Sequence, residues 1–154
     1  MVDAEYYKQF IRGIELDDIY IVSATFKRKW QHVSLPESAA VRVNFEPVKW
    51  RVDGQTLFVQ TRFNVTTSGR ATTNDGPEKP DEVLMIEFVV QLEYSVHNQE
   101  LGQLREEMHE EIVSIFMQRN VPVNVWPYAR EFISSTTVRM GFPALVIGTM
   151  KINI

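Results

Sequence analysis

The sequence reads VRVNFEPVKWRV at residues 41–52 and QTLFVQTRFNVT at residues 55–66, with Asp53-Gly54 between them. Apolar and polar residues alternate in both runs, which is typical of strands with one buried face. Asp-Gly between two such runs predicts an antiparallel hairpin with a type I′ turn, in which both central residues take positive φ. The alternation changes phase at Glu46-Pro47, which predicts a bulge or kink there.

Two further runs of alternating residues lie on either side of this hairpin. Residues 14–26 (IELDDIYIVSATF) carry apolar side chains on both faces, so we expect a strand that is covered on both sides. Residues 83–96 (VLMIEFVVQLEYSV) alternate without a break and predict the most regular strand of the chain. The segments 27–40 and 67–82 are rich in Pro, Gly or small polar residues, which predicts a crossover and a loop.

The apolar period changes from that of a strand to that of a helix in the C-terminal third. Residues 100–118 place Leu, Met, Ile and Phe on one stripe, which predicts an amphipathic helix that ends before Pro122. A second helix is predicted over residues 125–140, with Asn124 as N-cap and Pro127 in the first turn. Strands followed by helices favour the α+β class over a βαβ repeat.

Length, composition and charge place bounds on what the chain does. The 154 residues fit one domain spanning residues 1–154, and 44% apolar and 23% charged residues are typical of a globular protein. A net charge of −4 argues against a broad nucleic-acid surface. The absence of cysteine excludes disulfides, thiolate metal sites and cysteine nucleophiles. The sequence shows no signal peptide and no apolar run of membrane-spanning length, so we expect a cytoplasmic protein without membrane insertion.

The motifs of common enzyme classes are missing from the sequence. His32, His97 and His109 are not spaced as a zinc-binding pair, and the acidic run at residues 106–111 is interpreted as the solvated face of a helix. No nucleophile elbow and no glycine-rich phosphate loop occur. We therefore expect no enzyme activity, no cofactor and no metal.

Apolar side chains exceed what one covered face of a sheet needs. Both faces of the strand predicted at residues 83–96 are at least partly apolar. Large aromatic residues also lie near the ends of segments, and these are Trp30, Trp50, Trp126, Tyr128, Phe132 and Phe142. A surplus of this kind indicates either an interface between subunits or a surface for apolar ligands.

The segment NVPVNVWPYAREFISSTTVRMGFPAL at residues 120–145 resembles the signature of the SecB export chaperones. Residues 126–131 (WPYARE) match its aromatic-Pro-Tyr-Ala-Arg-Glu stretch, and Ser134-Ser135 match its hydroxyl pair. Residues 141–145 match its Gly-x-Phe/Pro-Pro-x-Leu end, with the spacing of the glycine slightly altered. Weaker matches lie in the predicted strands, at Asp18-Ile19, residues 59–66, Glu87 and residues 94–96.

The resemblance implies both a fold and an activity. The family fold is a four-stranded antiparallel sheet with helices packed on one face, and its subunits assemble as a dimer of dimers through the long helix. Its members are not enzymes. They hold unfolded secretory precursors in hydrophobic grooves without ATP and pass them to the translocase motor ATPase. On this basis we expect client binding at Trp50, Trp126, Tyr128, Phe132 and Phe142, and motor contact at Asp18 and Glu87.

The sequence departs from the family pattern at positions that concern transfer of the client to the motor. The family continues into a further helix and an acidic tail that engages the motor, whereas this sequence ends at Ile154. Val22 stands where the family has an acid, and Gln91-Leu92 stand where it has glycines. Three alternatives stay open: a SecB-like chaperone for a non-export partner such as an antitoxin, a SecB-shaped interaction module without clients, and, from a different class, a hot-dog acyl-thioesterase. For the thioesterase, only His97 or Glu93 is available as the catalytic group.

Overall fold

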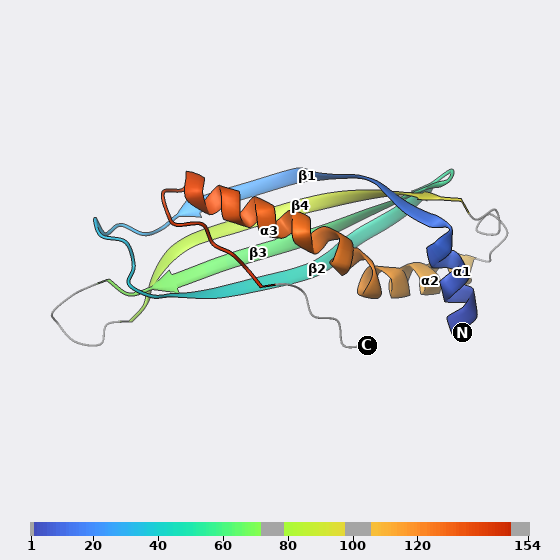
Figure 1. The fold of residues 1–154 in the computed structure, drawn as a ribbon, viewed down its shortest axis with the longest axis horizontal. Coiled ribbons are helices and arrows are strands. Elements are labelled where there is room, and N and C mark those ends of the chain that lie inside the picture. Colours follow the sequence, from blue (N-terminus) through green and yellow to red (C-terminus); the bar gives the residue numbers. More distant parts are fainter. Residues whose placement is uncertain (1, 72–78, 98–105, 149–154) are drawn as a thin grey trace.

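The structure, a computed structural model, describes residues 2–71, 79–97 and 106–148, with side chains from residue 110 onward in the last range (Figure 1). It belongs to the α+β class, as the sequence predicts. The elements in chain order are α1 (Ala4–Arg12), β1 (Ile14–Arg28), β2 (Ala39–Asp53), β3 (Thr56–Gly69), β4 (Asp81–Val96), α2 (Glu106–Arg119) and α3 (Val121–Arg139).

The strands form one antiparallel four-stranded sheet in the order β1-β4-β3-β2. Residues 29–38 therefore cross from one edge of the sheet to the other, and β1 pairs with the last strand, β4. Figure 1 shows a long, twisted sheet with α3 lying diagonally across one face and with α1 and α2 near one end. We refer to the face that carries α3 as the inner face and to the opposite one as the outer face.

The inner face of the sheet carries the hydrophobic core. Alternate residues of β3 and β4 are buried there, whereas the residues between them stay partly exposed. Phe63 pairs with Phe88 across the two central strands, and their rings stack at 4.9 Å. Each fully buried large apolar side chain stabilises the fold by about 1.5–3 kcal/mol. The strand predicted at residues 83–96 is β4, a central strand of the sheet.

The hairpin between β2 and β3 has a different turn from the one predicted. Asp53 pairs with Thr56, so the central residues of the turn are Gly54 and Gln55. Gly54 has a φ of 60°, and no described residue other than glycine has a positive φ. The type I′ prediction is therefore wrong, because positive φ at the first central residue alone is the type II′ pattern. The β2–β3 register shifts between Pro47 and Lys49, which confirms the predicted bulge.

The second predicted helix begins earlier than the sequence indicates. α3 starts at Val121, and Pro122 lies in its first turn, where the missing N–H costs no hydrogen bond. Asn124 is therefore not the N-cap; it lies inside the helix, and its Nδ2 donates to the Tyr94 hydroxyl at 3.0 Å. Pro127 is likewise an interior residue rather than one of the first turn.

The remaining helices also differ from the prediction. The helix predicted at residues 100–118 corresponds to α2, and its first predicted residues lie outside the described part of the chain. The alternation rules do not predict α1, which Asp3 caps by accepting a hydrogen bond from the Tyr6 N–H at 2.7 Å. α1 buries Phe10, whose ring meets Phe116 of α2 edge to face at 5.7 Å.

β1 is not covered on both sides, which corrects the prediction for residues 14–26. It is an edge strand, and the helices cover the inner face alone. Val22 stays 49% exposed and Phe26 47% exposed. The register shifts between Ile21 and Ser23, so Val22 lies at an irregularity that interrupts the alternation.

Candidate functional site

An apolar groove of about 340 Å³ lies at one end of the inner face. Its walls come from the crossover between β1 and β2, the paired ends of β3 and β4, the end of α3, and the segment that follows α3. The lining residues are Leu35, Pro36, Glu37, Ser38, Ala39, Thr67, Val83, Leu84, Thr137, Phe142, Pro143, Ala144 and Leu145. Glu37 is the only one of these that carries a charge at neutral pH, so the groove offers mainly apolar contacts.

The crossover wall is held close to the sheet by local contacts. Trp30 is buried, and its Nε1 donates to the Ser34 carbonyl at 2.8 Å. Gly69 at the end of β3 lets the crossover approach closely, because a Cβ at that position would lie 2.7 Å from the Cβ of Pro36 and 2.9 Å from the carbonyl oxygen of Ser38. Real Cβ atoms do not approach other heavy atoms this closely, so this wall requires glycine at residue 69.

The opposite wall is Phe142, which the chain positions from two sides. Gly141, with a φ of 87°, turns the chain sharply after α3, and the Phe142 N–H then donates to the Thr137 carbonyl at 3.1 Å. On the other side, the Arg28 guanidinium lies 4.4 Å from the centre of the Phe142 ring. The same guanidinium donates to the Met140 carbonyl at 2.6 Å. Arg28 therefore joins the end of β1 to the end of α3 at the groove.

The described C-terminal segment, residues 146–148, runs back along α3. Arg130 Nε donates to the Ile147 carbonyl at 2.8 Å. Trp126 Nε1 donates to the Gly148 carbonyl at 2.7 Å. Two residues of the WPYARE signature thus hold the segment that follows the groove-lining residues 142–145.

The five expected client-binding residues lie in different places. Phe142 lines the groove, whereas the other four are outside its lining. Phe132 packs between the helix and the sheet, with its ring 4.7 Å from Phe88 and 6.0 Å from Phe26. Trp126 packs on the sheet in the same manner, with its ring 5.8 Å from Phe63.

The last two expected client-binding residues are partly buried against the core. Trp50 pairs with Val59 in the β2–β3 ladder, which places it on the inner face. Tyr128 lies in α3, between the signature residues Pro127 and Ala129. The groove residues that the sequence did not single out come from the crossover, from β2, β3 and β4, and from the end of α3 and the segment after it. A leucine beside Pro36 in an otherwise polar loop was the available sequence signal.

The two expected motor-contact residues both lie on the outer face. Asp18 pairs with Glu93 in the ladder, and its carboxylate accepts a hydrogen bond from the Ile19 N–H at 2.9 Å. Glu87 lies further along β4, with its carboxylate 3.9 Å from the Arg62 guanidinium. The structure thus gathers acidic side chains from β1 and β4 on a face that no helix covers.

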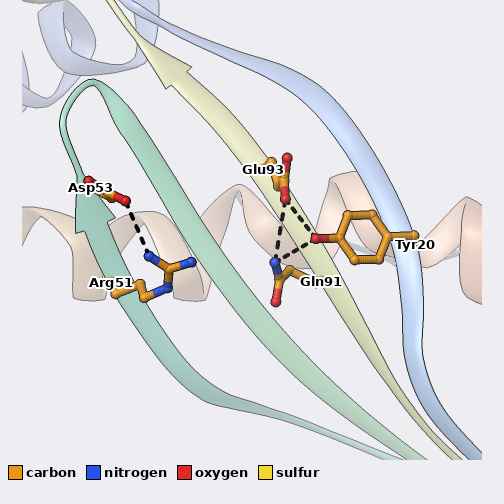
Figure 2. Close-up of polar contacts among 5 residues, drawn as sticks. All are labelled: Tyr20, Arg51, Asp53, Gln91 and Glu93. Carbon is orange, nitrogen blue, oxygen red and sulfur yellow. Dashed lines mark hydrogen bonds and ion pairs between the residues drawn. The ribbon is translucent and has the colours of Figure 1, made fainter.

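A chain of hydrogen bonds crosses the outer face from β3 to β1, and most of it is drawn in Figure 2. Gln60 Nε2 donates to Gln91 Oε1 at 2.8 Å, and Gln91 Nε2 donates to the Tyr20 hydroxyl at 2.7 Å. The Tyr20 hydroxyl in turn donates to Glu93 Oε1 at 2.6 Å. The hydrogen bond to Glu93 raises the pKa of Tyr20, because ionisation would remove the donor.

The residues named for a thioesterase or a metal do not form a site among the described residues. His97 is exposed and lies 3.6 Å from the Glu15 carboxylate, whereas Glu93 is bonded to Tyr20, and neither lines the groove. In the described part of the chain, no group of three or more His, Asp or Glu side chains is placed to hold a metal ion. The side chains of residues 106–109, part of the acidic run at residues 106–111, lie outside the described part.

None of the described helices is both long and apolar enough to cross a membrane. No family model matches the sequence, and no curated protein matches it. Among solved structures, the chain is similar to the SecB-like chaperone Rv1957 of Mycobacterium tuberculosis, in complex with a ChAD peptide from the Rv1956 HigA1 antitoxin. That match has a TM-score of 0.71 at 14% identity and covers 93% of this chain and 95% of that chain.

A second solved structure is less similar. A protein of unknown function from Streptococcus agalactiae matches with a TM-score of 0.35 at 9% identity, over 88% of this chain and 96% of that chain. The likeness to Rv1957 concerns the fold. This chain therefore has the fold of a SecB-like chaperone, as the resemblance of residues 120–145 implies.

Proposed function

We propose that this protein is an ATP-independent holdase, which binds unfolded or precursor polypeptides in the apolar groove described above. The observation that carries the proposal is the groove itself: its lining is mainly apolar, and Leu35 in its wall stays 49% exposed. Exposed apolar surface in a concave site is typical of binding sites for apolar ligands. The fold of a SecB-like chaperone supports the same role.

The affinity of such a groove depends on how much apolar surface of the client it buries, and it does not require a particular client sequence. A client segment that buries about 100 Å² of apolar surface gains about 2.5 kcal/mol, which alone is weaker than millimolar affinity. Several grooves must therefore act together on one client chain to give a useful affinity. For this reason we also propose that the chain works as a homo-oligomer, with the dimer of dimers of the SecB family as the expected form.

The expected client residues take different parts in this proposal. Phe142 is the direct aromatic contact, because it lines the groove. Trp126 and Phe132 pack on the sheet and support α3, which carries one wall. Trp50 and Tyr128 stay proposed client contacts on the inner face.

For the partner that receives the client, we propose the translocase motor of a cytoplasmic export pathway. The proposed contacts are two acidic residues on the outer face, the exposed Asp18 and the partly buried Glu87. The alternative is a chaperone dedicated to one partner such as an antitoxin. The antitoxin peptide bound to the structurally similar Rv1957 supports this alternative.

The test of the proposed function is the aggregation of a chemically unfolded client diluted into buffer, followed by light scattering. We expect suppression at near-stoichiometric amounts of this protein, equal with and without ATP. The same client added in its folded state is the control and should show no binding. Normal aggregation in the presence of well-folded protein would contradict the holdase proposal.

A further inference from the structure

The outer face of the sheet carries a strip on which the charges are separated. Two neighbouring rows of side chains cross all four strands, according to the registers of the three ladders. From β1 through β4 and β3 to β2, the first row reads Asp18, Glu93, Phe58 and Arg51. The second row reads Tyr20, Gln91, Gln60 and Lys49. We call these eight residues the dipolar strip, because acids lie at the β1 side and bases at the β2 side.

The charges at the two ends of the dipolar strip have few partners within the chain. Among the described residues, no carboxylate forms an ion pair with Lys49. No cationic side chain among them forms an ion pair with Asp18. The Arg51 side chain is 63% exposed, and its one ion pair within the described part of the chain is with Asp53, at 3.7 Å (Figure 2). Exposed pairs of this length contribute little to folding, so these charges are available to a partner.

The middle of the dipolar strip offers apolar surface and a recess. The Arg51 guanidinium stacks over the Phe58 ring at 3.9 Å, which leaves its remaining donors free to point outward. A recess of about 250 Å³ lies between these two residues, Lys49 and the amides of Gln60 and Gln91. A side chain with an acidic group and an apolar or aromatic neighbour fits this lining.

The dipolar strip is self-complementary. A two-fold axis that runs nearly along the strands, between two facing sheets, places the β1–β4 half of one copy over the β3–β2 half of the other. Asp18 of one copy then faces Arg51 of the second, Glu93 faces the Phe58 ring over which Arg51 stacks, and Tyr20 faces Lys49; each contact occurs twice. The strip also brings Tyr20, beside Glu93, over the recess of the second copy.

We infer that the outer face binds a second copy of this chain, sheet against sheet, with the acidic half of each dipolar strip on the basic half of the other. Strands about 4.8 Å apart and about 50 Å long give a face on the order of 800 Å² per copy, the size of a standard protein interface. This contact lies opposite the helices, through which the family is expected to assemble. A copy that uses both faces extends the oligomer, because the two contacts lie on opposite sides of the sheet. Asp18 is also a proposed motor contact, so the motor and the second copy compete for this face.

Charge reversal tests the inference, with mass measured by sedimentation velocity at low and at high salt. One variant carries Lys49→Glu and Arg51→Glu, and the second carries Asp18→Lys and Glu93→Lys. In each variant alone like charges face one another across the two-fold axis, so we expect the mass at low salt to fall at least about two-fold, to that of the oligomer held together through the helices. A mixture of the two variants restores opposite charges at every contact, and we expect it to regain the wild-type mass.

The control variant carries Lys8→Glu and Arg12→Glu, which reverse two exposed bases on the short helix α1 and should leave the mass unchanged. Circular dichroism and the thermal midpoint establish that each variant is folded. Restoration by mixing supports the inference, because a variant that had merely unfolded would not recover. Variants that keep the wild-type mass overturn it. A mixture that stays as light as the separate variants also overturns it.

Discussion

Gly69 shows how one residue shapes the groove. It lies where the end of β3 passes beneath the crossover, and the space for its missing side chain is already filled by Pro36 and Ser38. Gly69 does not have a positive φ, so its backbone conformation does not require glycine. Glycine is required because the crossover passes too close for a Cβ atom. The sequence places this residue in a polar Gly-containing loop, and nothing in that pattern reveals what approaches it.

We predict that Gly69→Ala destabilises the protein by about 1–3 kcal/mol, because the added Cβ forces the crossover away from the sheet. Urea unfolding measures the change. Gly148→Ala is the matched control, since a Cβ there meets no atom within 4 Å, and it should change the free energy of unfolding by less than about 0.5 kcal/mol. Equal effects of the two substitutions would contradict the close approach.

Tyr94 gives a prediction on pH. Burial raises its pKa to about 12, whereas an unfolded tyrosine ionises near pH 10. The unfolded chain therefore releases the phenol proton first, so this stabilisation is complete below about pH 10 and is lost as the pH rises to about 12. The loss amounts to roughly 2–3 kcal/mol at pH 12.

The measurement for Tyr94 is the free energy of unfolding against pH, compared with Tyr94→Phe. The variant lacks the phenol, so its stability should fall less steeply above about pH 10. It also leaves the Asn124 amide without its acceptor, so it should be less stable at neutral pH. Parallel curves for the two proteins above pH 10 would rule out the buried phenol as the cause.

At the scale of elements, the β2–β3 hairpin was predictable and its turn was not. Alternation predicts both strands and the bulge, because the period of side chains in a strand is a local property. The same Asp-Gly pair fits two registers, with either Asp53-Gly54 or Gly54-Gln55 as the central residues. The long ladder, rather than the turn, selects the second.

We predict that Gly54→Ala lowers stability by about 1 kcal/mol, because alanine is strained at a φ of 60°. Asp53→Ala should change stability by less than about 0.5 kcal/mol, since Asp53 lies in the extended strand β2. Thermal unfolding of the two variants checks both values. A larger loss for Asp53→Ala than for Gly54→Ala would favour the turn that the sequence first suggested.

Helix α3 shows the limit of reading breaks from proline. In the sequence, Pro122 predicts the end of one helix and Pro127 the first turn of the next. In the structure both lie within one helix, from Val121 to Arg139. Pro122 is tolerated in the first turn, and the bond from Asn124 to the Tyr94 hydroxyl joins the helix to the sheet. That contact is tertiary, so no local rule could supply it.

At the scale of the whole molecule, the class of the fold follows from the sequence but the groove does not. Strands followed by helices, and a strand as regular as residues 83–96, predict a sheet with one helix-covered face. The groove is assembled from four segments that lie far apart in the sequence. Phe142 was found because it belongs to the signature at residues 120–145, whereas Leu35 lies in a loop without a pattern.

The measurement that tests the central claim most directly is the affinity for a fluorescently labelled unfolded client, compared between Leu35→Glu and Val33→Glu. Both residues lie on the crossover and both are exposed, but only Leu35 lines the groove. A carboxylate in an apolar site must be desolvated when a client binds. We therefore expect Leu35→Glu to weaken binding at least about ten-fold and Val33→Glu to leave it unchanged. Wild-type affinity in both variants, or an equal loss in both, would contradict client binding in this groove.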